Sequence, residues 1–353
     1  MSPLDDRMLG HLRDVADLPD LTGTRYENPE RIARGGMGTI YTVRDTVLGR
    51  EVAMKVLSAP DPSGDLAGRL MAEARHLARL EHPNIIPVHD AGTLPDGRVF
   101  YVMTLVRGRR LDEWRAEGPS SPAMLRLFQT VCGTVAFAHA RGVIHRDLKP
   151  DNIMVGPFGE PLVMDWGVAK VLGASEVVSA GHSGGTSGPG ETHPGPTATL
   201  PGAVIGTPAW MAPEQARGEV QRLDARADVH ALGGILHFLL SGRPPFEGDS
   251  PREVLTRVIE SPPPSLRQAV PAVPRSLQSI CLKAMAKDPA GRYESALEMA
   301  GDIERYLDGL PVAAHRETPL EKGARVLRKH RTLALLVAAY LLMRVTVLVV
   351  TGR

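Results

Sequence analysis

The sequence is poor in cysteine, with two in 353 residues. Both of them, Cys132 and Cys281, lie in apolar stretches whose pattern predicts helices. Buried free thiols are therefore a better interpretation than a disulfide, and they fit the reducing environment of a cytoplasm. The sequence also lacks a secretory signal, because residues 1–20 contain acidic residues and no apolar run.

An excess of charge of either sign is missing too. The 41 lysines and arginines nearly balance the 40 aspartates and glutamates, so we expect no nucleic-acid partner. A small anion could still bind, because that requires only local positive groups. We find no internal repeat, and an apolar content of 43% is sufficient for a core in one two-lobed domain or in two ordinary ones.

A long hydrophobic run, LALLVAAYLLMRVTVLVV, occupies residues 333–350 and contains a single charge, Arg344. A helix needs about 20 apolar residues to cross a bilayer, within a range of about 17–25. A buried core helix would show a polar face with a period of 3.6 residues, and this run has none. We therefore expect a membrane-spanning helix, with Arg344 near enough to its end to extend outward. The basic residues before it should keep the preceding chain in the cytoplasm and leave three residues outside; they are Arg325, Arg328, Lys329 and Arg331.

The pattern changes from strands to helices along the chain. Between residues 24 and 106, apolar segments bounded by turn residues predict strands, with one helix over residues 65–81 that Pro83 ends. After Gly108 the pattern is mainly helical. Glycine, proline, serine and threonine make up 20 of the 31 residues in 173–203. This composition buries too little apolar surface to offset the entropy of ordering, so we expect a mobile loop there.

The glycine cluster in IARGGMGTIY, residues 32–41, could cradle a phosphate between two strands or form an ordinary turn. A phosphate loop of the form G-x-G-x-x-G-x-V would have glycine where this chain has Ala33. The other two glycines, Gly35 and Gly38, are present. The cluster alone does not decide between the two interpretations.

Two runs further along the chain decide it: VIHRDLKPDNIMV at residues 143–155 and VMDWGVAK at residues 163–170. Together with the glycine cluster, VAMK, APE, DVHALG and DPAGRY, they follow the order found in the eukaryotic-type (Hanks-type) protein kinases. The chain resembles the bacterial serine/threonine branch of this family over about residues 26–307. HRDLKPDN is fairly specific by itself, and the ordered set is more so.

The resemblance implies an α+β bilobal kinase fold, with a small β-rich N-lobe that has one main helix and a larger, mostly helical C-lobe. It implies ATP and Mg²⁺, or Mn²⁺ in its place, protein substrates with serine or threonine acceptors, and a role in bacterial signal transduction. The apolar run at 333–350 adds the expectation that the chain is anchored in the inner membrane. A homodimer is left open. The expected organisation is a lead-in at 1–23, an N-lobe at 24–106, a C-lobe at 107–309 with an activation segment at 165–214 and its insert at 173–203, a basic juxtamembrane segment at 310–332 and the membrane helix at 333–350.

Phosphoryl transfer requires positioning and the neutralisation of charge on the phosphate oxygens, which explains the residue types in these motifs. The resemblance implies that Asp147 accepts the proton of the substrate hydroxyl and that Lys149 contacts the γ-phosphate. A lysine in that position is typical of serine/threonine rather than tyrosine kinases. The carboxylate of Asp165 and the amide oxygen of Asn152 would each hold a Mg²⁺ ion.

Lys55 of VAMK would hold the α- and β-phosphates and pair with Glu73 from the following helix. Surface charge is the alternative for both residues. Against it, Lys55 lies within an apolar strand, where an unpaired ammonium group is costly. We expect Glu73 on the side of its helix away from the leucines at positions 66, 70 and 77, as a residue that points into a cleft.

Other expected nucleotide contacts come from both lobes. Gly35 is the glycine whose backbone must approach the phosphates most closely, and it is present. We therefore expect a functional loop, stiffer at Ala33 and with a modestly lower affinity for ATP. The expected contacts besides Lys55 are Ile32, Ala33, Gly35, Gly36, Met37, Gly38, Ile40, Ala53, Met103, Leu105 and Met154.

The resemblance also implies a regulatory set. Arg146 would pair with a phosphorylated activation loop and so order it. The threonines nearest to the GTPAWMAPE run, Thr197 and Thr199, are the expected autophosphorylation sites. The unusual length of the loop leaves the choice between them open.

Four further residues are expected to be structural. Thr207 would bridge the aspartate and lysine of HRDLKP. Asp228 would hydrogen bond to the backbone of the same motif, and Glu214 and Arg292 would form a buried ion pair.

Parts of the sequence are also compatible with two other functions. A membrane-tethered pseudokinase, a scaffold that binds ATP and partners without transfer, would be expected to lack Lys55, Asp147 or Asp165, and all three are present. Its support is limited to Ala33 and to Trp166, which stands in place of the more usual phenylalanine. A simple nucleotide-binding regulator would not need the aspartate and lysine of HRDLKP. An active kinase is the prediction.

Overall fold

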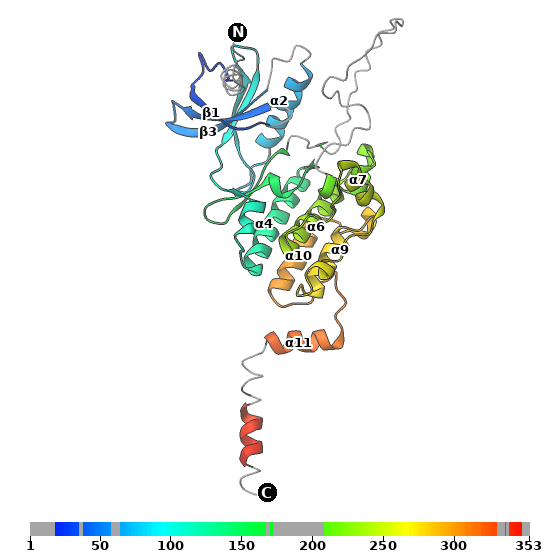
Figure 1. The fold of residues 1–353 in the computed structure, drawn as a ribbon. Helices are drawn as coiled ribbons and strands as arrows, with labels where there is room; N and C mark the ends of the chain where they lie inside the picture. Colours follow the sequence, from blue (N-terminus) through cyan, green and yellow to red (C-terminus); the bar gives the residue numbers. More distant parts are fainter. Residues whose placement is uncertain are drawn as a thin grey trace, which may run out of the picture.

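The computed structural model shows an upper lobe built on a β-sheet and a lower lobe built of helices (Figure 1). This is the bilobal arrangement that the resemblance implies. The structure describes residues 18–34, 38–57, 64–166, 170–171, 208–329, 336 and 339–347. The predicted insert at 173–203 lies outside the described residues, as does most of the lead-in.

The upper lobe is a five-stranded antiparallel sheet in the order β1-β2-β3-β5-β4. Its strands are β1 (Tyr26–Arg34), β2 (Gly38–Asp45), β3 (Arg50–Leu57), β4 (Val88–Thr93) and β5 (Val99–Thr104). Helix α2 (Asp65–Ala78) packs against β4 and β5, as Figure 1 shows. The helix predicted from the sequence is three residues longer at its C-terminal end.

The lower lobe is mainly helical. Its α-helices are α3 (Leu111–Ala116), α4 (Ser121–Ala140), α5 (Pro213–Ala216), α6 (Ala225–Ser241), α7 (Pro251–Glu260), α8 (Leu266–Ala269), α9 (Arg275–Ala284), α10 (Ala296–Leu307) and α11 (Pro319–Lys329). Its short 3₁₀ helices are η1 (Pro150–Asn152), η3 (Pro208–Trp210), η4 (Val220–Arg222) and η5 (Pro289–Gly291). Its two small sheets are formed by β6 (Arg109–Arg110), β8 (Ile153–Val155) and β9 (Pro161–Val163), and by β7 (Val143–Ile144) and β10 (Lys170–Val171).

Local signals in the sequence set the ends of the two central helices. α4 begins after Ser120, whose hydroxyl accepts a hydrogen bond from the backbone N–H of Ala123. α6 begins after Asp224, which caps Arg226 in the same way. It ends at Gly242, where a φ of 79° favours glycine. Both helices therefore begin, and α6 also ends, where capping residues stand in the sequence.

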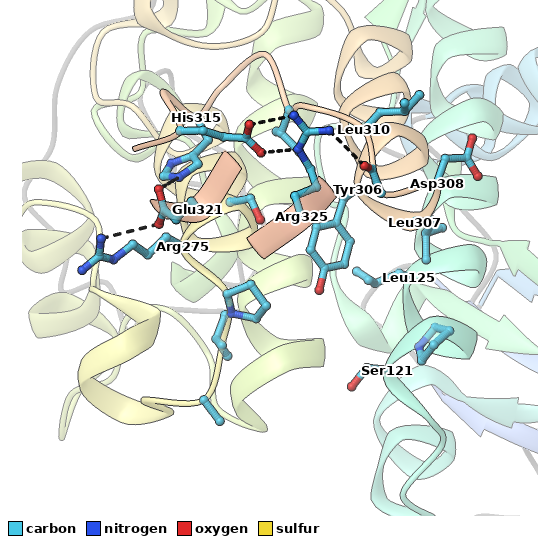
Figure 2. Close-up of a pocket in the computed structure, with 18 of the residues that line it drawn as sticks. Ser121, Leu125, Arg275, Tyr306, Leu307, Asp308, Leu310, His315, Glu321 and Arg325 are labelled. Atoms are coloured by element: carbon cyan, nitrogen blue, oxygen red, sulfur yellow. Dashed lines mark hydrogen bonds and ion pairs between the residues drawn. The ribbon is translucent and has the colours of Figure 1, made fainter. Parts of the chain in front are cut away.

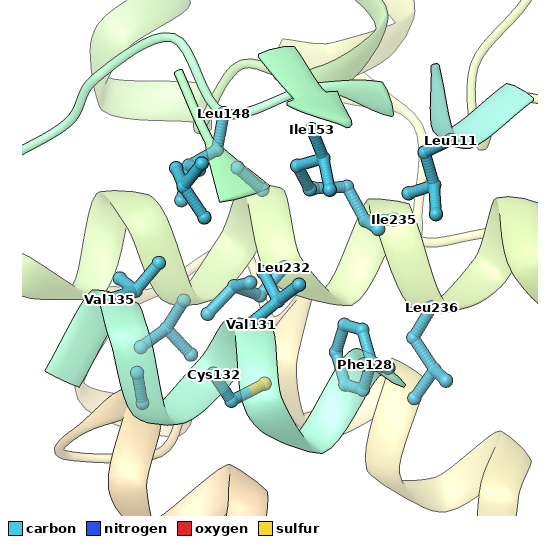
Figure 3. Packing of buried hydrophobic residues seen from close by; sticks show 14 of the residues in the cluster. Leu111, Phe128, Val131, Cys132, Val135, Leu148, Ile153, Leu232, Ile235 and Leu236 are labelled. Atoms are coloured by element: carbon cyan, nitrogen blue, oxygen red, sulfur yellow. The ribbon is translucent and has the colours of Figure 1, made fainter. Parts of the chain in front are cut away.

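The core of the lower lobe lies between α4 and α6 (Figure 3). Fully buried side chains come from α4 (Phe128, Val131, Cys132 and Val135), from α6 (Leu232, Ile235 and Leu236) and from the segment above them (Leu148 and Ile153). Leu148 lies within the HRDLKPDN run, and Ile153 directly follows it. This run is therefore anchored on the core along its length.

The prediction of buried free thiols is confirmed. Cys132 and Cys281 are both buried and unpaired. Burial in apolar surroundings raises the pKa of both thiols, so they remain protonated and unreactive at neutral pH.

The predicted membrane helix at residues 333–350 is described only at residues 336 and 339–347, all of them exposed. Within the described parts of the chain, no helix combines the length and the apolar character needed to cross a membrane.

Candidate active site

The loop of residues 145–152, here called the HRD loop, brings three of the predicted site residues together. The Nζ atom of Lys149 lies 2.8 Å from Oδ2 of Asp147. Asn152 donates through Nδ2 to the backbone oxygen of Asp147, at 2.8 Å, and to its Oδ2, at 3.2 Å. The turn of η1 makes this possible by returning Asn152 toward Asp147. The carboxylate of Asp147 is held from two sides, yet 16% of this side chain stays exposed and within reach of a hydroxyl group.

Asp228 of α6 holds the HRD loop from below. Its two carboxylate oxygens accept hydrogen bonds from the backbone N–H groups of His145, at 2.8 Å, and Arg146, at 2.9 Å. This is the contact expected for Asp228. It supports a positive φ of 68° at Arg146, a conformation that costs about 1–3 kcal/mol for a residue with a side chain.

His139 of α4 is a further partner of Asp228 that was not predicted, with Nε2 at 2.7 Å from Oδ2. Burial opposes the ionisation of this carboxyl group. The hydrogen bonds from His139 and from the backbone of Arg146 outweigh the effect of burial and lower the pKa of Asp228. The carboxylate is therefore charged and fully bonded, and it fixes the loop to the core helix.

Asp165 and Trp166 follow β9. Asp165 has a positive φ of 54°, its side chain is 49% exposed, and its Oδ1 lies 3.9 Å from Nζ of Lys55. Trp166 is fully buried, with its ring 4.6 Å from that of His145, and its Nε1–H donates to the backbone oxygen of Val163 at 3.2 Å. The tryptophan therefore fits the position of the more usual phenylalanine and has a partner for its one polar group.

The alternation of side chains in β3 determines where Lys55 points. Met54 and Val56 lie in the apolar cluster on one face of the sheet, so Lys55 lies on the other face, toward α2. Tyr101 of β5 is the cross-strand neighbour of Lys55 and shares that face.

Glu73 of α2 completes a network with these two residues. Its Oε1 lies 2.8 Å from Nζ of Lys55 and accepts a hydrogen bond from the hydroxyl group of Tyr101 at 2.7 Å. Burial and the neighbouring Glu73 carboxylate raise the pKa of Tyr101 well above its usual value, so this hydroxyl remains a donor. The pairing of Lys55 with Glu73 is as predicted, whereas the role of Tyr101 was missed.

The predicted orientation of Glu73 was wrong. Leu70 and Leu77 are buried at 5% exposure or less and Glu73 at 2%, whereas Leu66 is 43% exposed. Residues three and four apart share a helix face, so Glu73 lies beside Leu70 and Leu77 rather than opposite them. A carboxylate on this inner face needs a partner, which Lys55 and Tyr101 provide.

The predicted nucleotide contacts that the structure describes come from neighbouring strands. Ala33 pairs with Ile40, Ile40 pairs with Lys55, and Ala53 pairs with Met103, so these residues lie side by side across the sheet. Ile32 is 52% exposed at the edge strand β1. The other predicted nucleotide contacts that the structure describes are Gly38 in β2, Leu105 just after β5 and Met154 in β8.

Gly38 has a close backbone neighbour. A β-carbon at this position would lie 2.4 Å from the backbone oxygen of Val56 in β3, which is closer than real β-carbons approach. The strand pairing of β2 with β3 therefore requires glycine here, whatever else Gly38 does.

Several predicted residues cannot be placed. Gly35, Gly36 and Met37 of the glycine loop lie outside the described residues, and so do Thr197, Thr199 and Thr207.

Glu214 and Arg292 form the buried ion pair that the sequence predicts. Two parallel contacts of 2.7 Å join the guanidinium group to the carboxylate. Arg292 also donates to the backbone oxygens of Ala286, Arg226 and Lys287 at 2.8–3.1 Å. The pair connects α5 to the segments around α6 and α9.

Asp165 and Asn152 are the side chains that could hold Mg²⁺. Asn152 uses its Nδ2 to bond Asp147, so its oxygen Oδ1 is the side-chain atom that could coordinate a cation. No group of three or more histidine, cysteine, aspartate or glutamate residues in the described ranges is arranged to bind a metal. A carboxylate with one amide oxygen fits a Mg²⁺ ion that arrives with nucleotide phosphates, since this ion is usually bound in that way.

A family model described as the protein kinase domain matches residues 26–300. The chain belongs to the protein kinase family. This kinase chain is 38% identical over 304 residues to a probable serine/threonine-protein kinase of Streptomyces coelicolor, covering 84% of the chain and 42% of that protein. It is 39% identical over 306 residues to the serine/threonine-protein kinase PknB of Mycobacterium tuberculosis, covering 84% of the chain and 45% of that protein. The chain thus spans less than half the length of these curated relatives.

Solved kinase structures have the same fold. The kinase domain of Mycobacterium tuberculosis PknI, crystallised as a single mutant, matches 82% of this chain and 98% of its own, with a TM-score of 0.57 and 25% identity. A double mutant of the same domain gives a TM-score of 0.59 at 24% identity, with the same coverage of both chains.

Proposed function

We propose that the chain is a serine/threonine protein kinase, which transfers the γ-phosphate of ATP to serine and threonine hydroxyls of protein substrates. The observation that carries the proposal is the arrangement of Asp147, Lys149 and Asn152 on one anchored loop. It is supported by the Lys55 ammonium between two carboxylates and by relatives named serine/threonine kinases.

In this mechanism Asp147 orients the substrate hydroxyl group and accepts its proton as transfer proceeds. Asn152 and Lys149 hold the carboxylate in position. Lys149 is two residues from Asp147, so its ammonium group can also contact the phosphate as negative charge moves onto the acceptor oxygen.

Lys55 binds the α- and β-phosphates, with Glu73 holding its ammonium group in place. ATP with Mg²⁺, or Mn²⁺ in its place, supplies the phosphoryl group and neutralises part of its charge, with Asp165 and Asn152 as the protein ligands. The sheet residues Ala33, Ile40 and Ala53 and Met154 of the lower lobe would hold the adenine.

The proposal extends to regulation and location. Phosphorylation at Thr197 or Thr199 would create a partner for Arg146 and order the activation segment, and Thr207 would bridge the HRD loop. The kinase lobes lie in the cytoplasm of a bacterium, attached to the inner membrane by a single-pass helix at 333–350 and acting in signal transduction, either alone or as a homodimer.

The test is a phosphorylation assay on the full chain with radiolabelled ATP and Mg²⁺, followed by mapping of the labelled residues. We expect incorporation on serine or threonine, with Thr197 or Thr199 labelled first. A chain that binds ATP but labels neither itself nor a general protein acceptor would be a scaffold, and the proposal would fail.

Replacing Tyr101 with phenylalanine is expected to lower kcat/KM for ATP by about tenfold. The change removes only the hydroxyl group that bonds Glu73, and a hydrogen bond to a charged group contributes about 1.5–3 kcal/mol. Without it, Glu73 and α2 are held less firmly against Lys55. Steady-state kinetics with varied ATP measures the effect.

The matched control is Tyr26→Phe, which removes a hydroxyl group bonded to Asp90 at 2.8 Å outside the site. It should leave kcat/KM unchanged. Equal losses in both variants would mean that Tyr101 acts through general stability of the upper lobe.

A further inference from the structure

Helix α11 lies across the base of the lower lobe, below α9 and α10 (Figure 1). Its polar side faces that lobe. Glu321 contacts Arg275, at the start of α9, at 3.5 Å and His315 at 3.3 Å (Figure 2). His315 in turn lies 3.0 Å from the hydroxyl oxygen of Ser279. The backbone and side chain of Thr318 bond Glu321 and, with His315, lower its pKa to about 2.

Arg325, one turn further along α11, makes the second set of contacts. It bonds Glu317 at 2.7 and 3.0 Å and the backbone oxygen of Gly309 at 3.4 Å (Figure 2). Glu321 and Arg325 both line a cavity of about 860 Å³ between α11 and the base of the lobe. The ionic side of the helix is thus the one turned toward the protein.

The opposite side of α11 is apolar and faces outward. Leu320 is 86% exposed, and its neighbours Pro319 and Gly323 are exposed as well. In the sequence, the apolar residues Ala324 and Leu327 follow Leu320 at spacings of four and seven, the periodicity typical of an amphipathic helix. A helix at the surface of a globular protein normally turns its apolar face to the core, and α11 does the reverse.

The position of α11 in the chain indicates what covers this apolar face. The helix ends at Lys329, four residues before the apolar run that begins at Leu333, and four residues span at most about 14 Å. If the run enters a bilayer, α11 is at the bilayer surface. Apart from Glu321 and Arg325, which face the lobe, the helix carries three basic residues and no acidic one, a composition suited to anionic headgroups.

We propose that α11 is an interfacial helix, with the Leu320 face in an anionic bilayer and the Glu321 and Arg325 face clamped to the lower lobe. The inference rests on the proposed membrane anchor and is independent of the proposed kinase activity. The base of the lower lobe is thereby held on the membrane, and the upper lobe, at the other end of the molecule in Figure 1, is directed away from it.

A fluorescent probe at position 320 tests the proposal. In the full chain, Leu320→Cys can be labelled with an environment-sensitive dye such as NBD, because Cys132 and Cys281 are buried. The protein is reconstituted in vesicles of phosphatidylcholine and phosphatidylglycerol. We expect a blue-shifted emission that is quenched by lipids with a spin label near the headgroup, with less quenching in phosphatidylcholine alone.

Val47→Cys is the control, since Val47 is 70% exposed in the turn between β2 and β3 of the upper lobe, and its probe should show neither effect.

The possible failures are distinguishable. A chain that floats with the vesicles but whose probe at position 320 is neither shifted nor quenched would overturn the interfacial helix and leave the anchor intact. A probe that is shifted but not quenched by lipid would show that protein, such as a second copy of the chain, covers this face, which also overturns the proposal. A chain that does not float would refute both the anchor and the interfacial helix, whereas the phosphorylation assay tests the kinase activity separately.

Discussion

Replacing Asp147 with asparagine is expected to lower the rate of phosphoryl transfer by about 10²–10⁴-fold, the range typical for the loss of a general base. Asparagine has nearly the same shape, but its amide cannot accept a proton at neutral pH. The backbone oxygen of residue 147 still accepts the hydrogen bond from Asn152, so the loop should keep its conformation. Single-turnover transfer to a protein acceptor measures the rate, and ATP binding, measured separately, should change little.

Asp151→Asn is the matched control for this variant. Asp151 belongs to the same loop, but its carboxylate is about half exposed and pairs with Arg110 at 3.2 Å. Its replacement should leave the rate of phosphoryl transfer within about twofold of the parent's rate, because exposed ion pairs contribute about 0–1 kcal/mol. A rate for Asp147→Asn close to that of the parent would remove Asp147 from the mechanism.

Replacing Arg292 with methionine is expected to lower the free energy of unfolding by about 3–5 kcal/mol, as is usual when one partner of a buried ion pair is removed. The carboxylate of Glu214 would remain buried without its two contacts, and three backbone oxygens would lose a donor. This is a large fraction of the roughly 5–15 kcal/mol that stabilises a typical protein. Urea-induced unfolding followed by circular dichroism measures the change.

Arg257→Met is the control for the ion pair. Arg257 contacts Glu253 at 2.6 Å on α7, but both side chains are more than a third exposed, so the loss should be below about 1 kcal/mol. Arg292→Lys keeps the charge but loses the paired geometry, so its free energy of unfolding should lie between those of the parent and Arg292→Met. This variant keeps the test usable if Arg292→Met does not fold. A loss below about 1 kcal/mol for Arg292→Met would show that Glu214 finds other partners.

The fold and most of the described site could be predicted because the motifs have a fixed order and fixed spacing. Asp147, Lys149 and Asn152 are close in sequence, so one short loop necessarily brings them near one another. A lysine in an apolar strand needs an opposite charge, and the resemblance pointed to Glu73 on the following helix as the residue that supplies it.

Other features depend on contacts between distant segments and left no clear signal in the sequence. Tyr101 stands in an apolar β-strand, where the sequence does not distinguish a tyrosine with a hydrogen-bonded hydroxyl group from any other buried aromatic residue. Only the pairing of β5 with β3 places Tyr101 beside Lys55. His139 lies 89 residues from Asp228, and its one distinguishing signal is a polar residue in an apolar helix. The outward face of α11 has no separate signal in the sequence, because the basic residues of that segment equally indicate the flank of a membrane helix.

The close approach of Gly38 to the β3 backbone changes how variants of the glycine loop should be interpreted. A methyl group at position 38 would force β2 away from β3, the strand that carries Lys55. Lost activity in Gly38→Ala would therefore report a displaced lysine as readily as a damaged phosphate contact. The position of Ala33 is not restricted to glycine, because alanine already places a methyl group there. Ala33 pairs with Ile40 across the β1–β2 pair. Substitution of Ala33 by glycine, rather than of Gly38 by alanine, is the change that separates the flexibility of the loop from the integrity of the sheet.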